Sequence, residues 1–357
     1  MPWLCFTPLL YMENMTYCFL TLAYRFAHRL RSLVRHLLRP AVPQWGLMMC
    51  LLAATPNAWA QTEAEWEALK GDVRCFVLND MGRNGYYDQK PIAELAGRMA
   101  DVIGPDCIVA TGDVHHFDGV ASVNDPLWLT NFELIYSHPE LMIAWYPVLG
   151  NHEYRGCTQA VLDYAKVSRR WCMPSRYYTR VLTDKKAGVS LRLVLLDTTP
   201  LIDSYRAANQ KYPDAFRQDP DAQMAWLDSV LTVANEDWVV VMGHHPVYAQ
   251  TTKGEQERID MQNRLLPVFA RHPRKVAMYV SGHIHNFQHV RRAEGGDVDY
   301  VVNSAASLSR KVQPIEGTVF CSPEPGFSVL SATKQGVTLH MIDREGRVLH
   351  TVTHTRH

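Results

Sequence analysis

This chain of 357 residues contains five short polar motifs, each of which includes a glycine. They are NDMG at 79–82, GDVHH at 112–116, GNHE at 150–153, GHH at 243–245 and GHIH at 282–285. Aspartate and imidazole are ligands that first-row metals prefer, and this set is too large for one ion but suits two that share a carboxylate. Two metal ions about 3.5–4 Å apart are a common device for hydrolysis at phosphorus. The motifs therefore predict phosphoester hydrolysis.

Each motif follows an apolar segment that is expected to form a buried strand. These strands are predicted at 73–80, 107–113, 141–150, 238–243 and 276–282. Apolar residues at helical spacing predict helices at 91–103, 221–234 and 257–271. Such alternation is typical of an α/β domain, in which ligands gather at the C-terminal ends of the strands. Several short strands after residue 300 are expected to complete a second sheet.

Composition limits the classes of function. Apolar residues make up 47 % of the chain and its formal net charge is zero, so we expect a large core and no nucleic-acid partner bound through a basic surface. No linker is evident after residue 70. We therefore expect a single catalytic domain over residues 61–357.

Residues 1–60 differ from the rest of the chain and are predicted to be an N-terminal targeting region. They hold five arginines and one acid, Glu13, followed by an apolar run at 46–54 and the sequence AWA at 58–60. These are the parts of a secretory signal peptide, and the apolar run is too short to span a bilayer. The prediction is a periplasmic or secreted protein with no stable membrane span beyond this segment. Two alternatives stay open: an uncleaved membrane anchor, and a true start at Met12 or Met15.

Five cysteines follow residue 60, and an odd number leaves at least one free thiol. Cys157 and Cys172 enclose a short loop, and a disulfide there would add about 3 kcal/mol to stability. Cys75 and Cys107 lie inside predicted strands, where a thiol behaves as a small apolar group.

The motifs resemble those of the calcineurin-like metallophosphoesterases, and more narrowly the small purple acid phosphatases of the tartrate-resistant type. The likeness runs over about residues 72–355 and includes the segments 167–178, 225–228, 236–248 and 282–286. It implies a sandwich of two mixed β-sheets flanked by helices, with a dimetal site at the C-terminal ends of strands. It also implies hydrolysis of phosphate monoesters by a hydroxide that bridges the two metals.

The resemblance assigns a role to each ligand position in this sequence. Asp113 would bridge both metals, and His152 would be the general acid that protonates the leaving oxygen. Three further side chains would complete each metal site: Asp80, His116 and His285 for the first ion, and Asn151, His244 and His283 for the second.

His116 departs from the family, because purple enzymes carry a tyrosinate ligand at this position. A neutral imidazole removes one negative charge, so we expect two divalent ions in place of a ferric–divalent pair, with iron, zinc and manganese as the candidates. No purple colour and a pH optimum nearer neutral should follow. Spacing alone leaves open whether His115 or His116 is the ligand.

The second departure follows the fourth motif, where Thr252 and Lys253 stand in place of the family's acid and histidine. Lys253 is a candidate contact for substrate phosphate, and a solvated surface charge is the alternative. His245 is expected to shape the substrate pocket.

The sequence thus predicts an exported metal-dependent phosphatase acting on a small phosphate ester. One alternative is a phosphodiesterase or nucleotide-cleaving enzyme on the same dimetal centre. The other is a non-catalytic metal- or phosphate-binding surface protein, against which His152 argues, because binding alone needs no proton donor.

Overall fold

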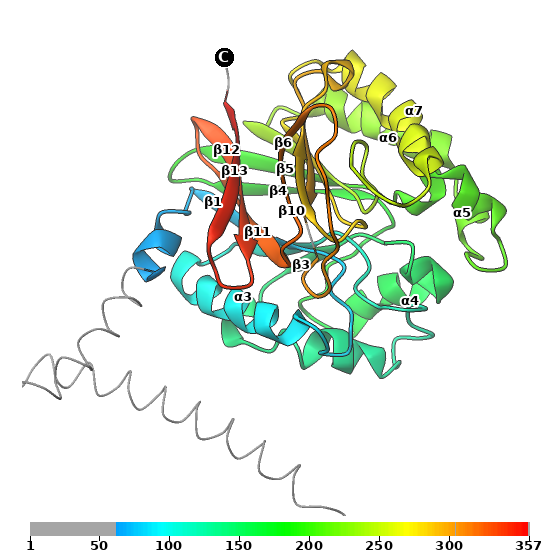
Figure 1. The fold of residues 1–357 in the computed structure, drawn as a ribbon, viewed down its shortest axis with the longest axis horizontal. Coiled ribbons are helices and arrows are strands. Elements are labelled where there is room, and N and C mark those ends of the chain that lie inside the picture. The colour runs from blue at the N-terminus through cyan, green and yellow to red at the C-terminus, as the bar shows by residue number, and fades with distance from the viewer. Residues whose placement is uncertain (1–61, 304, 356–357) are drawn as a thin grey trace, which may run out of the picture. The chain divides into compact units, whose positions relative to one another are not determined.

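The computed structural model describes residues 62–303 and 305–355, and the predicted targeting region 1–60 lies outside the described residues. Two β-sheets form the centre of the described part (Figure 1). The first sheet has the strand order β13-β12-β11-β1-β2-β3, and the second has the order β10-β8-β9-β7-β6-β5-β4. Both sheets mix parallel and antiparallel pairs and helices flank them, as predicted.

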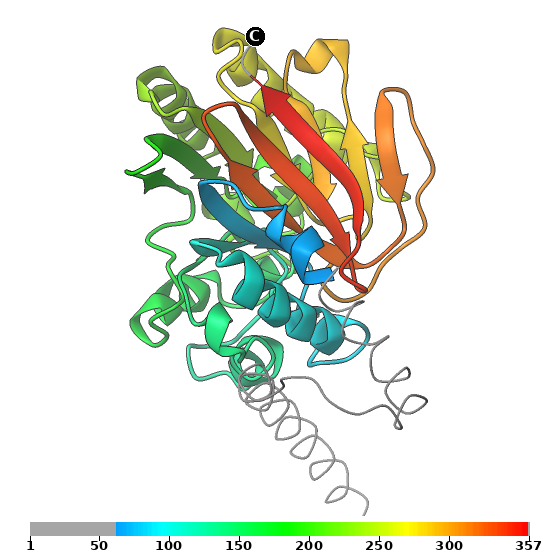
Figure 2. The ribbon, with the colours of Figure 1, turned by 90° about the vertical axis from the view of Figure 1, so that its left-hand side faces the viewer.

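The first sheet joins strands from both ends of the described chain. Its members are β1 (Val73–Leu78), β2 (Cys107–Ala110), β3 (Trp145–Pro147), β11 (Gly326–Ala332), β12 (Gly336–Asp343) and β13 (Val348–Thr355). Strands β1, β2 and β3 run parallel, and β11 pairs antiparallel with the other edge of β1. The sequence analysis expected these C-terminal strands to complete the second sheet. The three of them, red to orange in Figure 2, extend the first sheet instead.

The second sheet contains the strands that carry the fourth and fifth motifs. Its members are β4 (Tyr178–Asp184), β5 (Val189–Leu195), β6 (Trp238–Met242), β7 (Met278–Ser281), β8 (Phe287–Val290), β9 (Asp299–Asn303) and β10 (Thr318–Ser322). Strands β5, β6, β7 and β9 form a parallel run. Every residue of β6 and β7 is buried, which explains their unbroken apolar sequences.

The three predicted helices are present as α3 (Gln89–Ile103), α6 (Pro220–Val233) and α7 (Glu255–Arg271). The Asp219 carboxylate caps α6 by accepting the backbone N–H groups of Asp221 and Ala222. The shorter helices are α4 (Thr158–Asp163) and α5 (Asp203–Ala207). Figure 1 shows α3 and α4 on one side of the strands and α5, α6 and α7 on the other.

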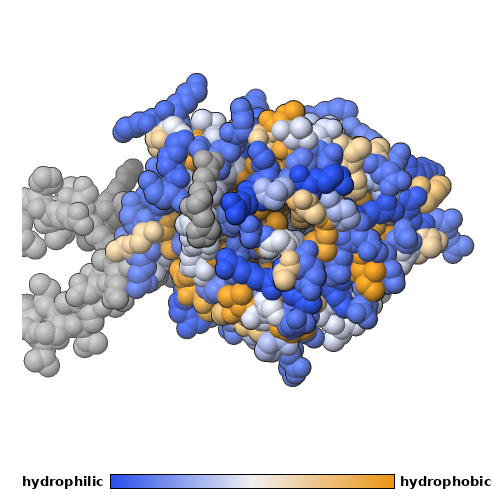
Figure 3. Space-filling model, turned by 90° about the horizontal axis from the view of Figure 1, so that it is seen from above, coloured by the Kyte–Doolittle hydropathy of each residue, from blue (hydrophilic) through white to orange (hydrophobic). Residues whose placement is uncertain are grey.

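The surface in Figure 3 is mostly hydrophilic, and its apolar residues lie in small separate groups. No helix in the described ranges has the length and apolar character needed to cross a membrane. The five cysteines of the described chain are free thiols, Cys157 and Cys172 included. Cys75 and Cys107 are buried side by side on β1 and β2, with their Sγ atoms 3.3 Å apart.

Candidate metal centre

The five motifs begin no more than three residues after five strands, three that run parallel in the first sheet and two that run parallel in the second. Strands β1, β2 and β3 are followed by the first three motifs, and β6 and β7 by the last two. Because the C-terminal ends of parallel strands share one edge of a sheet, these motifs meet at the same rim of the two sheets. Six predicted ligands from four motifs accordingly form overlapping groups: Asp80, Asp113, His116, His244, His283 and His285.

The first half of the centre contains Asp80, His116 and His285, whose ligand atoms lie within 4.8 Å of one another. The Nε2 atom of His285 is 3.1 Å from Oδ1 of Asp80. All three side chains are buried. Burial opposes the carboxylate charge, but the neighbouring imidazoles, His285 foremost, hold the pKa of Asp80 below its usual range.

The second half contains His244 and His283, with Asp113 between the two halves. Nε2 of His244 is 3.1 Å from Nδ1 of His283 and 3.2 Å from Oδ2 of Asp113. The same Oδ2 is 3.4 Å from Nε2 of His116 in the first half. Asp113 therefore has the position that a bridging carboxylate requires.

The donor atoms fit metal ions better than they fit one another. Among the described residues, Nδ1 of His116 and Oδ1 of Asn151 are buried without a hydrogen-bond partner. Oδ1 of Asp80 and Nε2 of His116 are buried and form no hydrogen bond beyond their ion-pair approaches to His285 and Asp113. Such orphaned polar atoms are costly unless a ligand satisfies them. Carboxylate, amide and imidazole donors together suit divalent iron, zinc or manganese.

Backbone carbonyls orient two of the imidazoles. Nδ1 of His244 donates to the carbonyl of Thr111 at 2.9 Å, and Nδ1 of His285 donates to that of Leu308 at 2.7 Å. Each bond leaves Nε2 free to face the centre, as metal-ligating histidines require. Burial disfavours a charge on His244, but Asp113 outweighs it and raises the pKa to about 9. Metal binding must displace that proton, so metal affinity falls as the pH is lowered.

Four of the candidate ligands have left-handed backbone conformations. The φ angles are 48° at Asp80, 54° at Asp113, 71° at His283 and 65° at His285. Non-glycine residues adopt this region at a cost and do so mainly at functional sites. The strained turns direct these side chains into the centre immediately after their strands end.

Glycine 282 allows the fifth motif to approach the first one closely. A Cβ atom at Gly282 would lie 2.6 Å from Nδ2 of Asn79 and 2.7 Å from Oδ2 of Asp80. We expect Gly282→Ala to lower the free energy of unfolding by about 1–3 kcal/mol, because the added methyl overpacks this contact. Urea unfolding and metal analysis would measure the loss of stability and of bound metal. Gly254→Ala is the matched control, since nothing lies within 4 Å of its added Cβ, and an equal effect of both substitutions would contradict the prediction.

The structure separates the two histidines of the second motif. His116 lies in the centre, whereas His115 packs edge-on against Trp128 at 4.4 Å and approaches Asn131 Nδ2 with its Nδ1 at 3.4 Å. Burial lowers the pKa of His115 to about 3, which keeps this imidazole neutral. The geometry thus favours His116 as the ligand.

His152 lies at the edge of the centre, with its side chain 15 % exposed. Its Nδ1 donates to the carbonyl of Phe117 at 2.6 Å, and its Nε2 is 3.8 Å from Oδ2 of Asp113. Burial lowers the pKa of His152 to about 3 although Asp113 opposes the shift. This value lies well below the ordinary pKa of an imidazole, about 6.5.

Lys253 and His245 both lie beside the second half of the centre, and the ligand atoms of His245, His244 and His283 lie within 4.8 Å of one another. Nζ of Lys253 is 2.8 Å from Nε2 of His283 and 3.0 Å from its carbonyl oxygen. Burial lowers the pKa of Lys253 to about 8. His245 is fully buried, its Nδ1 is 2.9 Å from Oγ1 of Thr198, and its Nε2 has no hydrogen-bond partner.

Sequence reasoning missed the role of Glu153 in connecting the second and third motifs. Its buried carboxylate accepts the backbone N–H groups of Asp113 at 2.9 Å, His115 at 3.0 Å and Gly150 at 2.7 Å. Burial, reinforced by Asp113, raises the pKa of Glu153 to about 7. Its position within the third motif was the available signal.

Glu257 is the second residue that the sequence analysis missed, because nothing in the sequence of α7 marks it. Its Oε2 is 3.0 Å from Nε2 of His283, and its Oε1 accepts the hydroxyl of Tyr205 at 2.9 Å. A carboxylate in this place fixes the orientation of the imidazole and raises its basicity.

We expect Glu257→Gln to weaken metal affinity by about 10- to 100-fold, because the amide no longer supports His283 as a base. Competition with a coloured chelator would measure the affinity. Glu255→Gln on the same helix is the control, since Glu255 is exposed. Unchanged metal affinity in Glu257→Gln would show that this contact does not support the centre.

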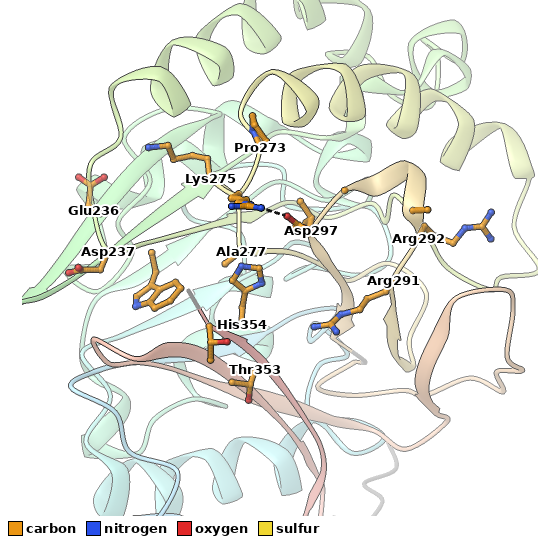
Figure 4. Close-up of a pocket in the computed structure, with 16 residues that line it drawn as sticks. Glu236, Asp237, Pro273, Lys275, Ala277, Arg291, Arg292, Asp297, Thr353 and His354 are labelled. Atoms are coloured by element: carbon orange, nitrogen blue, oxygen red, sulfur yellow. Dashed lines mark ion pairs between the residues drawn. The ribbon is translucent and has the colours of Figure 1, made fainter. Parts of the chain in front are cut away.

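A cavity of about 920 Å³ lies elsewhere in the described chain, beside the N-terminal ends of β6 and β7. Figure 4 shows its charged lining, in which Arg274 pairs with Asp297 at 3.7 Å. Lys275 donates to the carbonyl of Ala234, and Arg291 pairs with Asp299. This cavity shares no residue with the motifs and lies at the opposite strand ends from them.

Comparison with known proteins agrees with this geometry. Residues 73–287 match the calcineurin-like phosphoesterase family. Purple acid phosphatase 4 of Arabidopsis thaliana is 27 % identical over 323 residues, covering 85 % of this chain and 91 % of that protein. Tartrate-resistant acid phosphatase type 5 of Oryctolagus cuniculus is 32 % identical over 272 residues, covering 74 % and 80 %.

A solved structure shares the fold. GAP50, the anchor in the inner membrane complex of Plasmodium, superposes with a TM-score of 0.68 at 22 % identity, covering 80 % of this chain and 89 % of that one. One family assignment follows from the strand ends that carry the motifs, the clusters of Asp and His side chains, and the two phosphatase relatives. The chain belongs to the calcineurin-like phosphoesterase family, with purple and tartrate-resistant acid phosphatases as its relatives, and is a hydrolase of phosphoric ester bonds from a family that uses a dimetal centre.

Proposed function

We propose that this chain is an exported phosphatase that hydrolyses small phosphate monoesters. The observation that carries the proposal is the position of Asp113, whose Oδ2 is 3.4 Å from His116 and 3.2 Å from His244, one in each half of the centre. Asp80 and His285 would complete the first half, and Asn151 and His283 would complete the second. Two bound metal ions would activate water and polarise the phosphoryl oxygens.

The proposed role of His152 is general acid. The bond from its Nδ1 to the carbonyl of Phe117 directs Nε2 toward Asp113 and the centre. Because burial depresses its pKa, Nε2 holds a proton only when an anion lies beside it. A bound phosphate ester supplies that anion, and the proton then passes to the oxygen of the leaving group.

Two further parts of the proposal rest on sequence. Export is supported by the basic region, the apolar run at 46–54 and the AWA sequence at 58–60. A divalent metal pair is supported by His116, a neutral imidazole at the position of the tyrosinate in purple enzymes. A strong visible absorption band in the isolated protein would contradict the divalent pair.

The test compares 4-nitrophenyl phosphate with bis(4-nitrophenyl) phosphate as substrates. The full chain is reconstituted in turn with iron, zinc and manganese, and each rate is measured over a range of pH with and without chelator. We expect chelator-sensitive turnover that is faster on the monoester and peaks near neutral pH with divalent ions. Faster turnover of the diester would favour the phosphodiesterase alternative, and no turnover with any metal would contradict the proposal.

A further inference from the structure

Two thiols face each other in the middle of the first sheet. Cys75 lies on β1 and Cys107 on β2, and the two residues are direct partners in the parallel register of these strands. Both side chains are fully buried, and their Sγ atoms are 3.3 Å apart. A separation of this size leaves no room for a third group between the two sulfur atoms.

The backbone at this pair meets the distance requirement for a disulfide. A disulfide needs two Cα atoms about 4.4–6.8 Å apart, and neighbouring strands of a sheet lie about 4.7–4.9 Å apart. Because Cys75 and Cys107 are register partners, their Cα atoms are separated by about one strand spacing. Closing the bond then needs a small approach of the two side chains and no rearrangement of β1 or β2.

The order of the cysteines along the chain favours the same pair. Cys75 and Cys107 are the first two cysteines after residue 60. An exported chain that enters an oxidising compartment from its N-terminal side presents these two thiols before the others. Cys157 and Cys172, which the sequence analysis considered as a pair, are half-buried free thiols in the described chain.

The folded core protects the pair from chemistry in either direction. Contact with Cys107 and burial both raise the pKa of the Cys75 thiol. The thiolate is the form that reacts with a disulfide, so the buried thiols are slow to oxidise once the sheet has formed. Oxidation therefore belongs to the stage before β1 and β2 are covered, and a bond formed then is shielded from reductants.

We propose, building on the export that is part of the proposed function, that Cys75 and Cys107 form a structural disulfide when the chain folds in an oxidising compartment. The oxidant is itself a disulfide, such as oxidised glutathione. One cysteine thiolate attacks it, which forms a mixed disulfide and releases one thiolate. The second cysteine thiolate attacks the mixed disulfide and releases the other. One S–S bond forms in the chain as one breaks in the oxidant, and the two electrons leave with the released thiolates.

The bond would connect the strands that carry two candidate metal ligands. Asp80 follows the end of β1 at Leu78, and Asp113 follows the end of β2 at Ala110. The closed loop, residues 75–107, contains α3 and the whole first motif. Such a cross-link restricts the unfolded chain and so stabilises the fold that brings these two carboxylates together.

The first experiment maps the disulfide after refolding of the reduced full chain. One sample refolds with reduced and oxidised glutathione, and the other with reduced glutathione alone. Each is quenched in acid, unfolded, alkylated, digested and analysed by mass spectrometry. In the first sample we expect the peptide containing Cys75 to be joined to the peptide containing Cys107. Alkylation of all eight cysteines of the chain, or a bond from either residue to a different cysteine, would overturn the inference.

The second experiment measures Tm for both refolded samples. The parent chain should melt roughly 5–10 °C higher after refolding with oxidised glutathione, as expected for a loop of this length. Cys75→Ala should have one Tm under both conditions. Cys321→Ala, which removes a thiol from β10 in the other sheet, is the matched control and should keep the difference. An equal Tm for the two parent samples would overturn the stabilising role of the bond.

If Cys75→Ala does not fold, Cys107→Val carries the comparison, since it removes the other end of the same bond. Neither experiment depends on turnover, so the two proposals can fail separately. A chain that hydrolyses phosphate esters but keeps both thiols after refolding with oxidised glutathione contradicts the disulfide alone. A chain that forms the disulfide but hydrolyses no phosphate ester contradicts the phosphatase function alone.

Discussion

Asp113→Asn is expected to lower kcat by about 10³-fold or more, because several kcal/mol of transition-state stabilisation depend on the metals that this carboxylate holds. Oδ2 of Asp113 faces His116 and His244, and its Oδ1 accepts the backbone N–H of His152 at 2.9 Å. An amide keeps the shape of the side chain but loses the negative charge shared by both halves. Metal analysis and rates on nitrophenyl phosphate would measure the effect.

The control for this substitution is Asp118→Asn, an exposed aspartate shortly after the same motif. It should retain both metal and activity. Full metal content together with a small loss of rate in Asp113→Asn would show that Asp113 does not bridge the two halves.

His152→Asn is expected to slow hydrolysis of alkyl phosphates by about 10²- to 10⁴-fold, because these leaving groups need a proton from a general acid. Nitrophenyl phosphate should be affected much less, since nitrophenolate leaves without one. The asparagine amide can still donate to the carbonyl of Phe117, so the loop should keep its conformation. Steady-state rates on the two ester types provide the comparison.

The pH profile gives an independent check on His152. Only its protonated form donates, and burial leaves the bound ester as the anion that keeps this proton in place, so kcat on alkyl phosphates should fall as the pH rises above neutral. This alkaline fall should be absent in His152→Asn. Equal losses on both ester types, or an unchanged profile, would remove His152 from the mechanism.

The sequence predicted the strand ends well because their pattern is local. Four of the apolar runs that end in a motif became buried strands, from β1 at Val73–Leu78 to β7 at Met278–Ser281. The run predicted at 141–150 holds only the short strand β3 (Trp145–Pro147), because its start belongs to a 3-10 helix at Pro139–Leu141. The burial of those runs and the helical spacing of α3, α6 and α7 are properties of short windows. The convergence of the motifs then followed from parallel pairing.

Features that depend on contacts distant in sequence were not predictable. Strand β11 pairs with β1, and no window of residues contains that pairing. The contact of Glu257 with His283 likewise joins a helix to a loop beyond it.

The pairing of β1 with β11 has a consequence for biosynthesis. β1 is among the first strands made, yet one of its edges stays unpaired until residues 326–332 have been synthesised. Such long-range pairing is slow, and an exposed strand edge is open to aggregation in the meantime. A chain that crosses a membrane before folding would meet the same delay on the far side. Chaperone dependence during production should therefore be greatest for forms truncated before β11.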